Sequence, residues 1–142
     1  MRRRLRSEDS DAGSISVELT LLTPLLVLLV LFVVAAGRLA DAQARVDQAT
    51  YSAARAASLS RDPAIAARAA RSTATGALDR PAACASLNVD VDATAFVPGG
   101  TVTVQVTCVV SLADLTGLGL PGNRTLSSTS TSPLDRFRAV TR

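Results

Sequence analysis

The sequence contains no histidine and no tryptophan, has only two cysteines, and is only 3% aromatic. Without histidine, neither a Ser-His-Asp nor a Cys-His arrangement can form, and no histidine is available as a metal ligand. The cysteines do not form a Cys-x-x-Cys pair, and the glycine-rich stretches at 98–100 and 117–122 have turn contexts rather than the context of a phosphate-binding loop. We therefore expect no enzyme, no catalytic residue, no metal site and no cofactor.

Charge and aromatic content argue against a second class of function. The net charge is only +3, the arginines cluster only near the N-terminus, and there is a single tyrosine. A nucleic-acid partner is therefore not expected. The lack of aromatic residues also predicts a core of Ala, Val and Leu, which buries a modest area and leaves a small domain marginally stable.

The longest uncharged stretch is Leu19 to Gly37. As a helix it would extend about 28 Å, close to the hydrocarbon thickness of a bilayer. Arginines precede it at positions 2, 3, 4 and 6. Because positive residues stay on the cytoplasmic side, we predict a single transmembrane helix at 14–37, with a cytoplasmic N-terminus and an extracytoplasmic segment at 38–142.

The residues just before this stretch have the spacing of a prepilin-type signal. Gly13 would end a basic leader, 1–13, that a peptidase removes, and Ser14 would become the new N-terminus. An unpaired amine at the edge of a low-dielectric helix bundle is costly. Glu18, a little over one turn further on, would neutralise that amine on the same or a neighbouring subunit.

Three other interpretations of the N-terminal region stay open. A secretory signal peptide would be cleaved at Ala40-Asp41-Ala42 or Ala42-Gln43-Ala44, but its apolar region is usually shorter. An unprocessed single-pass anchor explains the length and orientation of the apolar run but not the spacing of Gly13 and Glu18. A buried helix of a soluble protein is rarely apolar on all sides in so small a chain.

Residues 13–59 resemble the TadE-like pilus-assembly proteins of tight-adherence (Tad/Flp) systems. The shared pattern is an acid, an apolar run with a proline, and an Ala-Ala-Arg-Ala helix downstream, although Leu19 stands where an aromatic residue is usual. The matching residues are Gly13, Glu18, Leu21-Leu22-Thr23-Pro24-Leu25-Leu26, Gly37-Arg38 and Gln48 to Ser58. The resemblance implies a pseudopilin, or minor pilin-like, component of a pilus or secretion apparatus. Its implied partners are the prepilin peptidase, the major pilin, other pilin-like subunits and the inner-membrane assembly platform.

The helix is expected to continue outside the membrane over residues 38–60. Apolar residues recur there at intervals of three and four, the spacing of a helix packed lengthwise on another helix. This packing stripe consists of Ala35, Leu39, Ala42, Val46, Ala49, Ala53 and Ala56. Its small residues would allow close contact with the protein's own sheet or with neighbouring pilin-like subunits. On the other side of the helix, Asp41 and Arg45 have the spacing of an i,i+4 ion pair.

Residues 61–142 are expected to form a small extracytoplasmic α+β domain. Asp62 and Pro63 predict the start of a short helix that ends near residue 77. Alternating apolar residues predict an antiparallel hairpin of Leu87–Val97 and Thr101–Leu112, with the even-numbered residues of the second strand facing the core. A loop is predicted at Leu115–Asn123, and a third, edge strand at Thr125–Thr131.

Both cysteines lie in the part predicted to be outside the cytoplasm, which favours a disulfide between Cys84 and Cys108. Simple hairpin pairing does not place them opposite each other, so Cys84 would have to fold back over the sheet. Two free, buried thiols are the alternative. The sequence thus predicts an α+β, type IV pilin-like membrane protein: a long N-terminal transmembrane helix, a short helix, and a small disulfide-linked antiparallel sheet of two or three strands.

Overall fold

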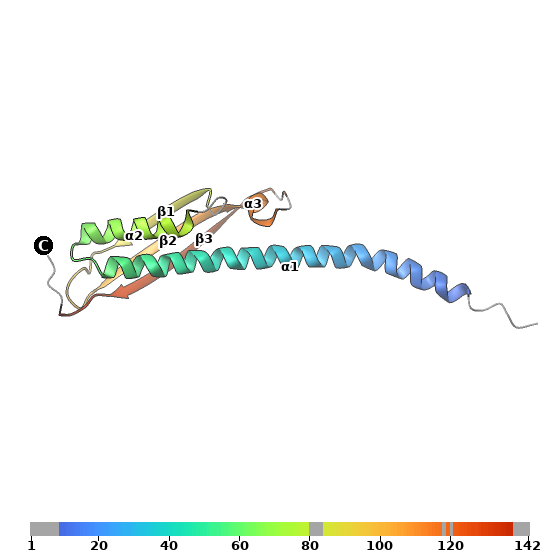
Figure 1. Ribbon diagram of the computed structural model, residues 1–142, viewed down its shortest axis with the longest axis horizontal. Coiled ribbons are helices and arrows are strands. Elements are labelled where there is room, and N and C mark those ends of the chain that lie inside the picture. The colour runs from blue at the N-terminus through green and yellow to red at the C-terminus, as the bar shows by residue number, and fades with distance from the viewer. Residues whose placement is uncertain (1–8, 80–83, 118, 120, 138–142) are drawn as a thin grey trace, which may run out of the picture. The chain divides into compact units, whose positions relative to one another are not determined.

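The computed structural model of the chain describes residues 9–79, 84–117, 119 and 121–137. Its elements are α1 (Asp9–Ser58), α2 (Pro63–Leu78), β1 (Ser86–Asp92), β2 (Thr101–Ser111), α3 (Leu112–Thr116) and β3 (Asn123–Pro133) (Figure 1). The chain divides into two compact units, one up to Ala36 and one from Gly37 onward, and α1 contributes residues to both. The long helix, the shorter helix and the antiparallel sheet confirm the predicted fold class.

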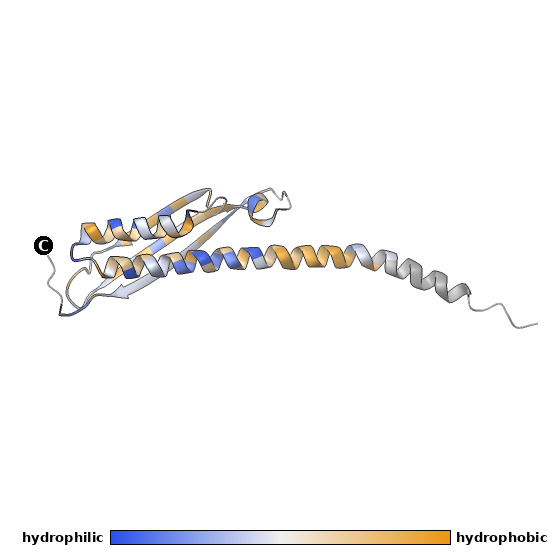
Figure 2. Ribbon diagram, viewed as in Figure 1, coloured by the Kyte–Doolittle hydropathy of each residue, from blue (hydrophilic) through white to orange (hydrophobic). Residues whose placement is uncertain are grey.

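The first unit contains the apolar part of α1. Every large apolar side chain from Leu25 to Val34 is exposed, with exposed fractions between 38% and 72%. Figure 2 shows this stretch as an orange segment of the helix. Among the described residues, α1 is the one helix long and apolar enough to cross a membrane, and its apolar window is not buried against protein. A helix apolar on all sides with no protein cover is suited to lipid, as expected of a single-pass membrane protein.

The second unit begins with the remainder of α1, followed by α2. The predicted cap of α2 is confirmed: the Asp62 carboxylate accepts the backbone N–H groups of Ala64 at 2.8 Å and Ile65 at 3.0 Å. Pro63 occupies the first turn, where no N–H donor is required. The helix continues through Gly76 to Leu78 and buries a line of residues four apart, Ala66, Ala70, Ala74 and Leu78.

The sheet has the order β1-β2-β3, and both pairings are antiparallel. This arrangement confirms the predicted hairpin and the third strand at an edge. The third strand is longer than expected, because its pairing with β2 extends from Asn123 opposite Ser111 to Pro133 opposite Thr101.

The predicted extent of the first strand, Leu87–Val97, is wrong. Pairing ends at Asp92, whose carboxylate accepts the backbone N–H of Thr94 at 2.9 Å and turns the chain out of the sheet. The backbone N–H of Phe96 then donates to the carbonyl of Ala93 at 3.2 Å. This turn lets Phe96, only 7% exposed, enter the core, where a continuing edge strand would not have placed it.

The predicted loop at Leu115–Asn123 is also partly wrong, because α3 occupies its beginning. The Ser111 hydroxyl accepts the backbone N–H of Asp114 at 3.4 Å and caps the short helix. Gly117, with a left-handed φ of 68°, ends it, and its N–H donates to the carbonyl of Ala113 at 3.0 Å. The Ser-x-x-Asp spacing of Ser111 and Asp114 is a local signal for the start of this helix.

The core lies between the two helices and one face of the sheet. The predicted inward face of β2 is confirmed, since its side chains are at most 2% exposed: Val102, Val104, Val106, Cys108 and Val110. The helices contribute mainly small residues, above all alanine, to the core against this face. The inner face of β3 has Leu126 at one end and serines after it, of which Ser132 is buried. The opposite face of the sheet is polar and remains open.

The disulfide between Cys84 and Cys108 is present, with Cα atoms 5.4 Å apart. Cys84 lies two residues before β1, whereas the residue paired with Cys108 is Leu87. Cys84 therefore lies over the inner face of the sheet, as the offset of the two cysteines required.

Candidate functional site

The residues predicted to direct processing, Gly13, Ser14 and Glu18, all lie in the first part of α1. Helical geometry places positions 14 and 18 on one face, about 6 Å apart along the axis. The side chains of these residues, and residues 1–8 of the predicted leader, lie outside the described part of the structure. The backbone thus has the spacing needed for an amine at position 14 to approach a carboxylate at position 18.

The apolar part of α1 is interrupted by two threonines and a proline, Thr20, Thr23 and Pro24. Pro24 lies inside the helix, where it lacks an N–H group and its ring crowds the carbonyl four residues earlier, that of Thr20. Thr20, Thr23, Pro24, Val27 and Leu28 line a shallow hollow on this segment. Because one helix supplies all of its walls, the hollow does not enclose a ligand by itself.

The packing stripe divides into parts with different surroundings. Val46, Ala49 and Ala53 are at most 2% exposed and belong to the core of the second unit. Leu39 and Ala42 are half-buried and pack against that core. The remaining members, Ala35 in the first unit and Ala56 near the end of α1, are half-buried and are not core residues. The structure therefore uses most of the stripe beyond Gly37 within the chain.

The buried line on α1 departs from the stripe toward its end. From Val46 to Ala57, the positions that are at most 2% exposed are Val46, Ala49, Thr50, Ala53, Ala54 and Ala57. These span eleven residues in three turns, whereas the stripe assumes a repeat of seven in two turns. A straight helix drifts by about 20° per heptad relative to the shorter repeat, so Ala57 replaces Ala56 at the contact. The buried hydroxyl of Thr50 donates to the carbonyl of Val46 at 2.7 Å, which satisfies it within the helix.

Polar side chains hold α1 to the sheet and to α3. The amide nitrogen of Gln43 donates to the Ser127 carbonyl of β3 at 3.1 Å and to the Asp47 carboxylate at 3.0 Å. The Arg38 guanidinium donates to the Leu115 carbonyl at 3.3 Å. The side-chain amide of Gln43 therefore covers part of the β3 edge, which would otherwise present an unpaired carbonyl there.

The predicted i,i+4 ion pair is confirmed, with Nε of Arg45 2.9 Å from Oδ2 of Asp41. Both side chains are more than half exposed, at 53% and 63%. Solvent screens an ion pair of this kind, so it contributes little to stability and leaves this side of α1 wet.

The two exposed carboxylates of β1, Asp90 and Asp92, lie on the open sheet face and at a turn. Asp90 lies opposite Gln105 on the open face of the sheet. The pKa of Asp92 is lowered because its carboxylate accepts hydrogen bonds from Thr94, first from the backbone and then from the side chain. Asp92 therefore acts as a turn residue. In the described ranges, no group of three or more His, Cys, Asp or Glu side chains could hold a metal ion.

Residues 13–55 match the family model described as TadE-like protein. Neither the curated proteins nor the solved structures give a match. The matched segment includes Gly13, Glu18, the apolar run and most of the packing stripe, and it agrees with the resemblance noted in the sequence. With the exposed apolar helix, it supports a membrane protein related to Tad pilus systems.

Proposed function

We propose, from the TadE-like segment at 13–55, that this protein is a non-enzymatic pseudopilin, a minor pilin-like component of a Tad-type pilus assembly or secretion apparatus. The observation that carries the proposal is the position of the match. It covers the candidate cleavage site, the lone acid and the apolar helix as one continuous segment, and all three lie within α1. A protein of this kind acts by assembling with other chains.

The first step of the proposed mechanism is removal of the leader after Gly13 by a prepilin peptidase. Cleavage creates a positively charged α-amine on Ser14, at the start of a helix whose following residues are apolar. Such a charge is costly in a low-dielectric bundle unless it is paired. The carboxylate of Glu18, from the same or a neighbouring subunit, supplies the opposite charge.

The second step is lateral packing of the apolar helix. The side chains from Leu25 to Val34 are exposed around the helix, so they can contact lipid before assembly and pilin-like helices after it. The proposed neighbours are the major pilin and other pilin-like subunits, gathered by an inner-membrane assembly platform. Because most of the stripe from Leu39 to Ala53 is occupied within the chain, these contacts are assigned to the helix before Gly37.

The third element of the proposal is the orientation. The arginines at 2, 3, 4 and 6 favour a cytoplasmic N-terminus, and the compact unit from Gly37 onward would then be extracytoplasmic. The disulfide between Cys84 and Cys108 supports this placement, since disulfides form and persist mainly in oxidising compartments.

The intact mass and N-terminal residue of the protein from its native membrane test this proposal. We expect a start at Ser14, with or without a methyl group on the amine. A start at Met1 would leave an unprocessed single-pass anchor. A start beyond Ala40 would show that the apolar run is only an export signal for a secreted domain. Either of these results contradicts the proposed processing.

The pairing of Glu18 has its own test, because the sequence contains no lysine. The α-amine is therefore the only primary amine of the chain. Carbodiimide treatment of native membranes should yield an amide that joins Ser14 to Glu18, or joins Glu18 to the N-terminus of another pilin-like subunit. Glu18→Gln should abolish the cross-link and impair assembly. Asp41→Asn, which removes an exposed carboxylate beyond the apolar run, is the matched control and should leave both unchanged.

A further inference from the structure

The edge strand β3 consists mostly of residues with hydroxyl side chains. From Thr125 to Pro133, seven of nine residues are serine or threonine, and none is charged. A segment rich in serine and threonine that also contains proline has the composition of O-glycosylated chains. Core packing does not require this composition, because the inner face of a strand in a small domain is normally apolar, whereas that of β3 is mostly serine.

The backbone of β3 has one open side. The strand pairs with β2 and ends the sheet, and just beyond the ladder the Leu134 N–H donates to the Gly100 carbonyl at 2.8 Å. Because hydrogen-bonded and non-hydrogen-bonded pairs alternate in an antiparallel ladder, the even-numbered residues of β3 bond to β2. The odd-numbered residues therefore direct their backbone N–H and C=O groups away from the sheet. Gln43 of α1 accordingly reaches an odd-numbered carbonyl, that of Ser127, at 3.1 Å.

The same odd-numbered residues carry exposed hydroxyl groups. We call the hydroxyls of Thr125, Ser127 and Thr129 the edge hydroxyls; all three residues are exposed on the open face of the sheet. Within the described part of the chain these hydroxyls make no hydrogen bond, whereas the Thr131 hydroxyl lies 3.0 Å from that of Thr103. The even-numbered serines face inward and are half-buried or buried: Ser128, Ser130 and Ser132.

The edge hydroxyls are presented in the way that an enzyme recognises an extended peptide. Backbone groups of an exposed edge can pair with a strand of another protein, and side chains on alternate residues then enter its pockets. At each odd-numbered position of β3, an exposed side chain and outward backbone groups belong to the same residue. The hydroxyls of Thr103 and Thr107 on β2 are less accessible, because strands lie on both sides of β2 and both residues are half-buried.

The two edges of the sheet also differ in their protection against pairing with other chains. β1 carries Asp90 and Asp92, and charged side chains discourage such pairing. The single charged residue of β3 is Arg124, near its start, and Gln43 covers the carbonyl of Ser127. A bulky hydrophilic group on the edge hydroxyls would cover the part of this edge that neither residue protects.

We propose that β3 is a site of O-glycosylation, with the edge hydroxyls as the acceptors. The donor is a sugar whose anomeric carbon is bonded to a phosphate, and a glycosyltransferase supplies the base. The hydroxyl oxygen bonds to the anomeric carbon, and the bond from that carbon to the phosphate oxygen breaks. The phosphate leaves with the electron pair, and the hydroxyl proton passes to the base. The inference depends neither on the proposed assembly role nor on processing at Gly13.

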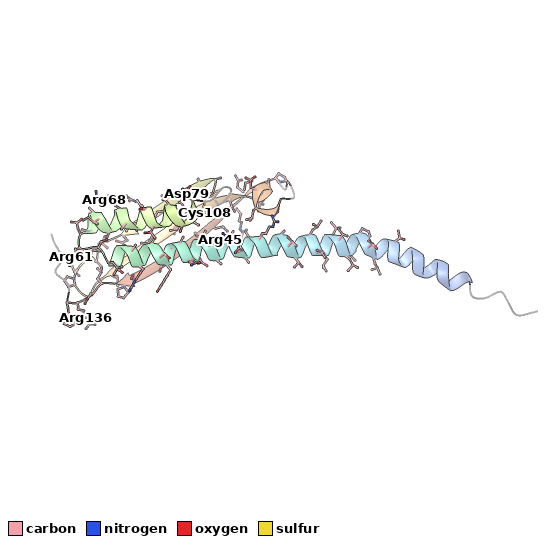
Figure 3. All side chains as sticks on the ribbon, in the orientation of Figure 1. Arg45, Arg61, Arg68, Asp79, Cys108 and Arg136 are labelled. Atoms are coloured by element: carbon pink, nitrogen blue, oxygen red, sulfur yellow. A yellow bond between two sulfur atoms is a disulfide. The ribbon has the colours of Figure 1, made fainter. Side chains whose placement is uncertain are left out.

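Peptide mapping by mass spectrometry, on the protein extracted from its native membrane, tests this proposal. Trypsin cleaves after Arg124 and after Arg136, which lies just beyond the end of β3 (Figure 3). The released peptide 125–136 should carry the added mass of one or more sugar units. Peptide 72–124, which contains the hydroxyls of β1 and β2, is the internal control and should have its unmodified mass. Electron-transfer fragmentation should place the sugars on the edge hydroxyls and not on the inward-facing serines.

The triple variant Thr125→Val, Ser127→Ala and Thr129→Val, produced in the native cells, should lose the added mass completely. Thr103→Val with Thr107→Val, on the same face of β2, is the matched control and should keep it. Valine suits a strand as well as threonine does, and thermal melting verifies that both variants are folded. The proposal is overturned if peptide 125–136 of the wild-type protein has its unmodified mass or carries phosphate instead. Sugars on the inward-facing serines, or an added mass that persists in the triple variant, would equally overturn it.

Discussion

Individual polar residues determine where the elements of the second unit begin and end. Asp62 starts α2, Asp92 ends β1 and Ser111 starts α3, each by accepting a backbone N–H group that the element leaves unpaired. These bonds are local, within two or three residues. Their effect is not local, because the turn at Asp92 brings Phe96 into the core and sets the position of the loop that carries Val97.

The disulfide is the single covalent constraint within the described part of the second unit. Replacing both cysteines, by Cys84→Ala and Cys108→Ala, should lower the free energy of unfolding by roughly 3 kcal/mol, since the bond closes a loop of about 25 residues in the unfolded chain. Denaturation of the full-length protein in detergent, followed by circular dichroism, measures the change. A reductant should destabilise the wild-type protein and not the double variant. Equal stability of the two proteins without reductant would contradict the prediction.

Asp92 should make the stability of the protein depend on pH in the acid range. Its pKa is lowered in the folded state by the hydrogen bonds from Thr94, so the carboxylate is stabilised as the anion. This contribution is fully present above the unfolded value near 3.8 and is lost as the pH falls through the lowered pKa. Asp92→Asn should therefore flatten the fall in melting temperature below about pH 4.

Asp90→Asn serves as the control for this measurement. Asp90 lies on the same exposed face of β1 but is not the acceptor of the Thr94 bonds. If both variants change the fall in melting temperature at acid pH equally, the hydrogen bonds at Asp92 are not the cause of that pH dependence.

At the scale of the element, α1 serves two environments with one continuous helix. From Leu22 to Val34 its large apolar side chains are exposed all round, whereas from Gly37 onward one face, made mostly of small residues, is buried. The buried alanines of α1 belong to the same core as the valines of β2, and a closely packed core has little free volume for larger side chains.

Enlarging a buried residue of this line should be destabilising. Ala53→Leu should cost about 1–3 kcal/mol of unfolding free energy, because the added atoms enter a packed core at a position that is 0% exposed. Ala44→Leu, the same change at an exposed position of α1, should be nearly neutral. Thermal or chemical denaturation of the isolated protein distinguishes them. Equal effects of the two substitutions would contradict the placement of Ala53 in a closely packed core.

At the scale of the whole molecule, the two units differ in composition. The predicted topology puts the apolar helix in the membrane and the unit from Gly37 onward outside the cytoplasm. The apolar helix has the exposed surface of a lipid-facing element, while the unit from Gly37 onward has its own core and a disulfide. The N-terminal arginines favour a cytoplasmic, reducing location for the N-terminus. The disulfide favours an oxidising location, on the other side of the membrane, for the unit from Gly37 onward.

Alkaline phosphatase fusions should report this topology, because the enzyme is active only where its own disulfides can form. A fusion after Ser60 should be active, and a fusion after Glu8 should be inactive. An active fusion after Glu8 with an inactive fusion after Ser60 would mean that the orientation is opposite to the predicted one. Activity at neither position would show that the apolar helix does not carry the following chain across the membrane.

Several features of this protein were determined by local sequence alone. Periodicity, capping chemistry and composition were enough to predict the apolar run, the Asp62 cap and the inward face of β2. Because the chain has only two cysteines, composition also indicated the disulfide between them. None of these predictions requires knowledge of distant residues. The TadE-like segment was equally recognisable, and the processing of Gly13 and pairing of Glu18 stay predictions about assembly rather than about the fold of one chain.

Only the tertiary structure decided the end of β1, the extent of β3 and the use of the stripe. Phe96 is buried where strand pairing would have exposed it, and Ala57 rather than Ala56 is the buried position near the end of α1. Periodicity identifies which residues share a face of one element, but the partner of that face depends on packing between elements.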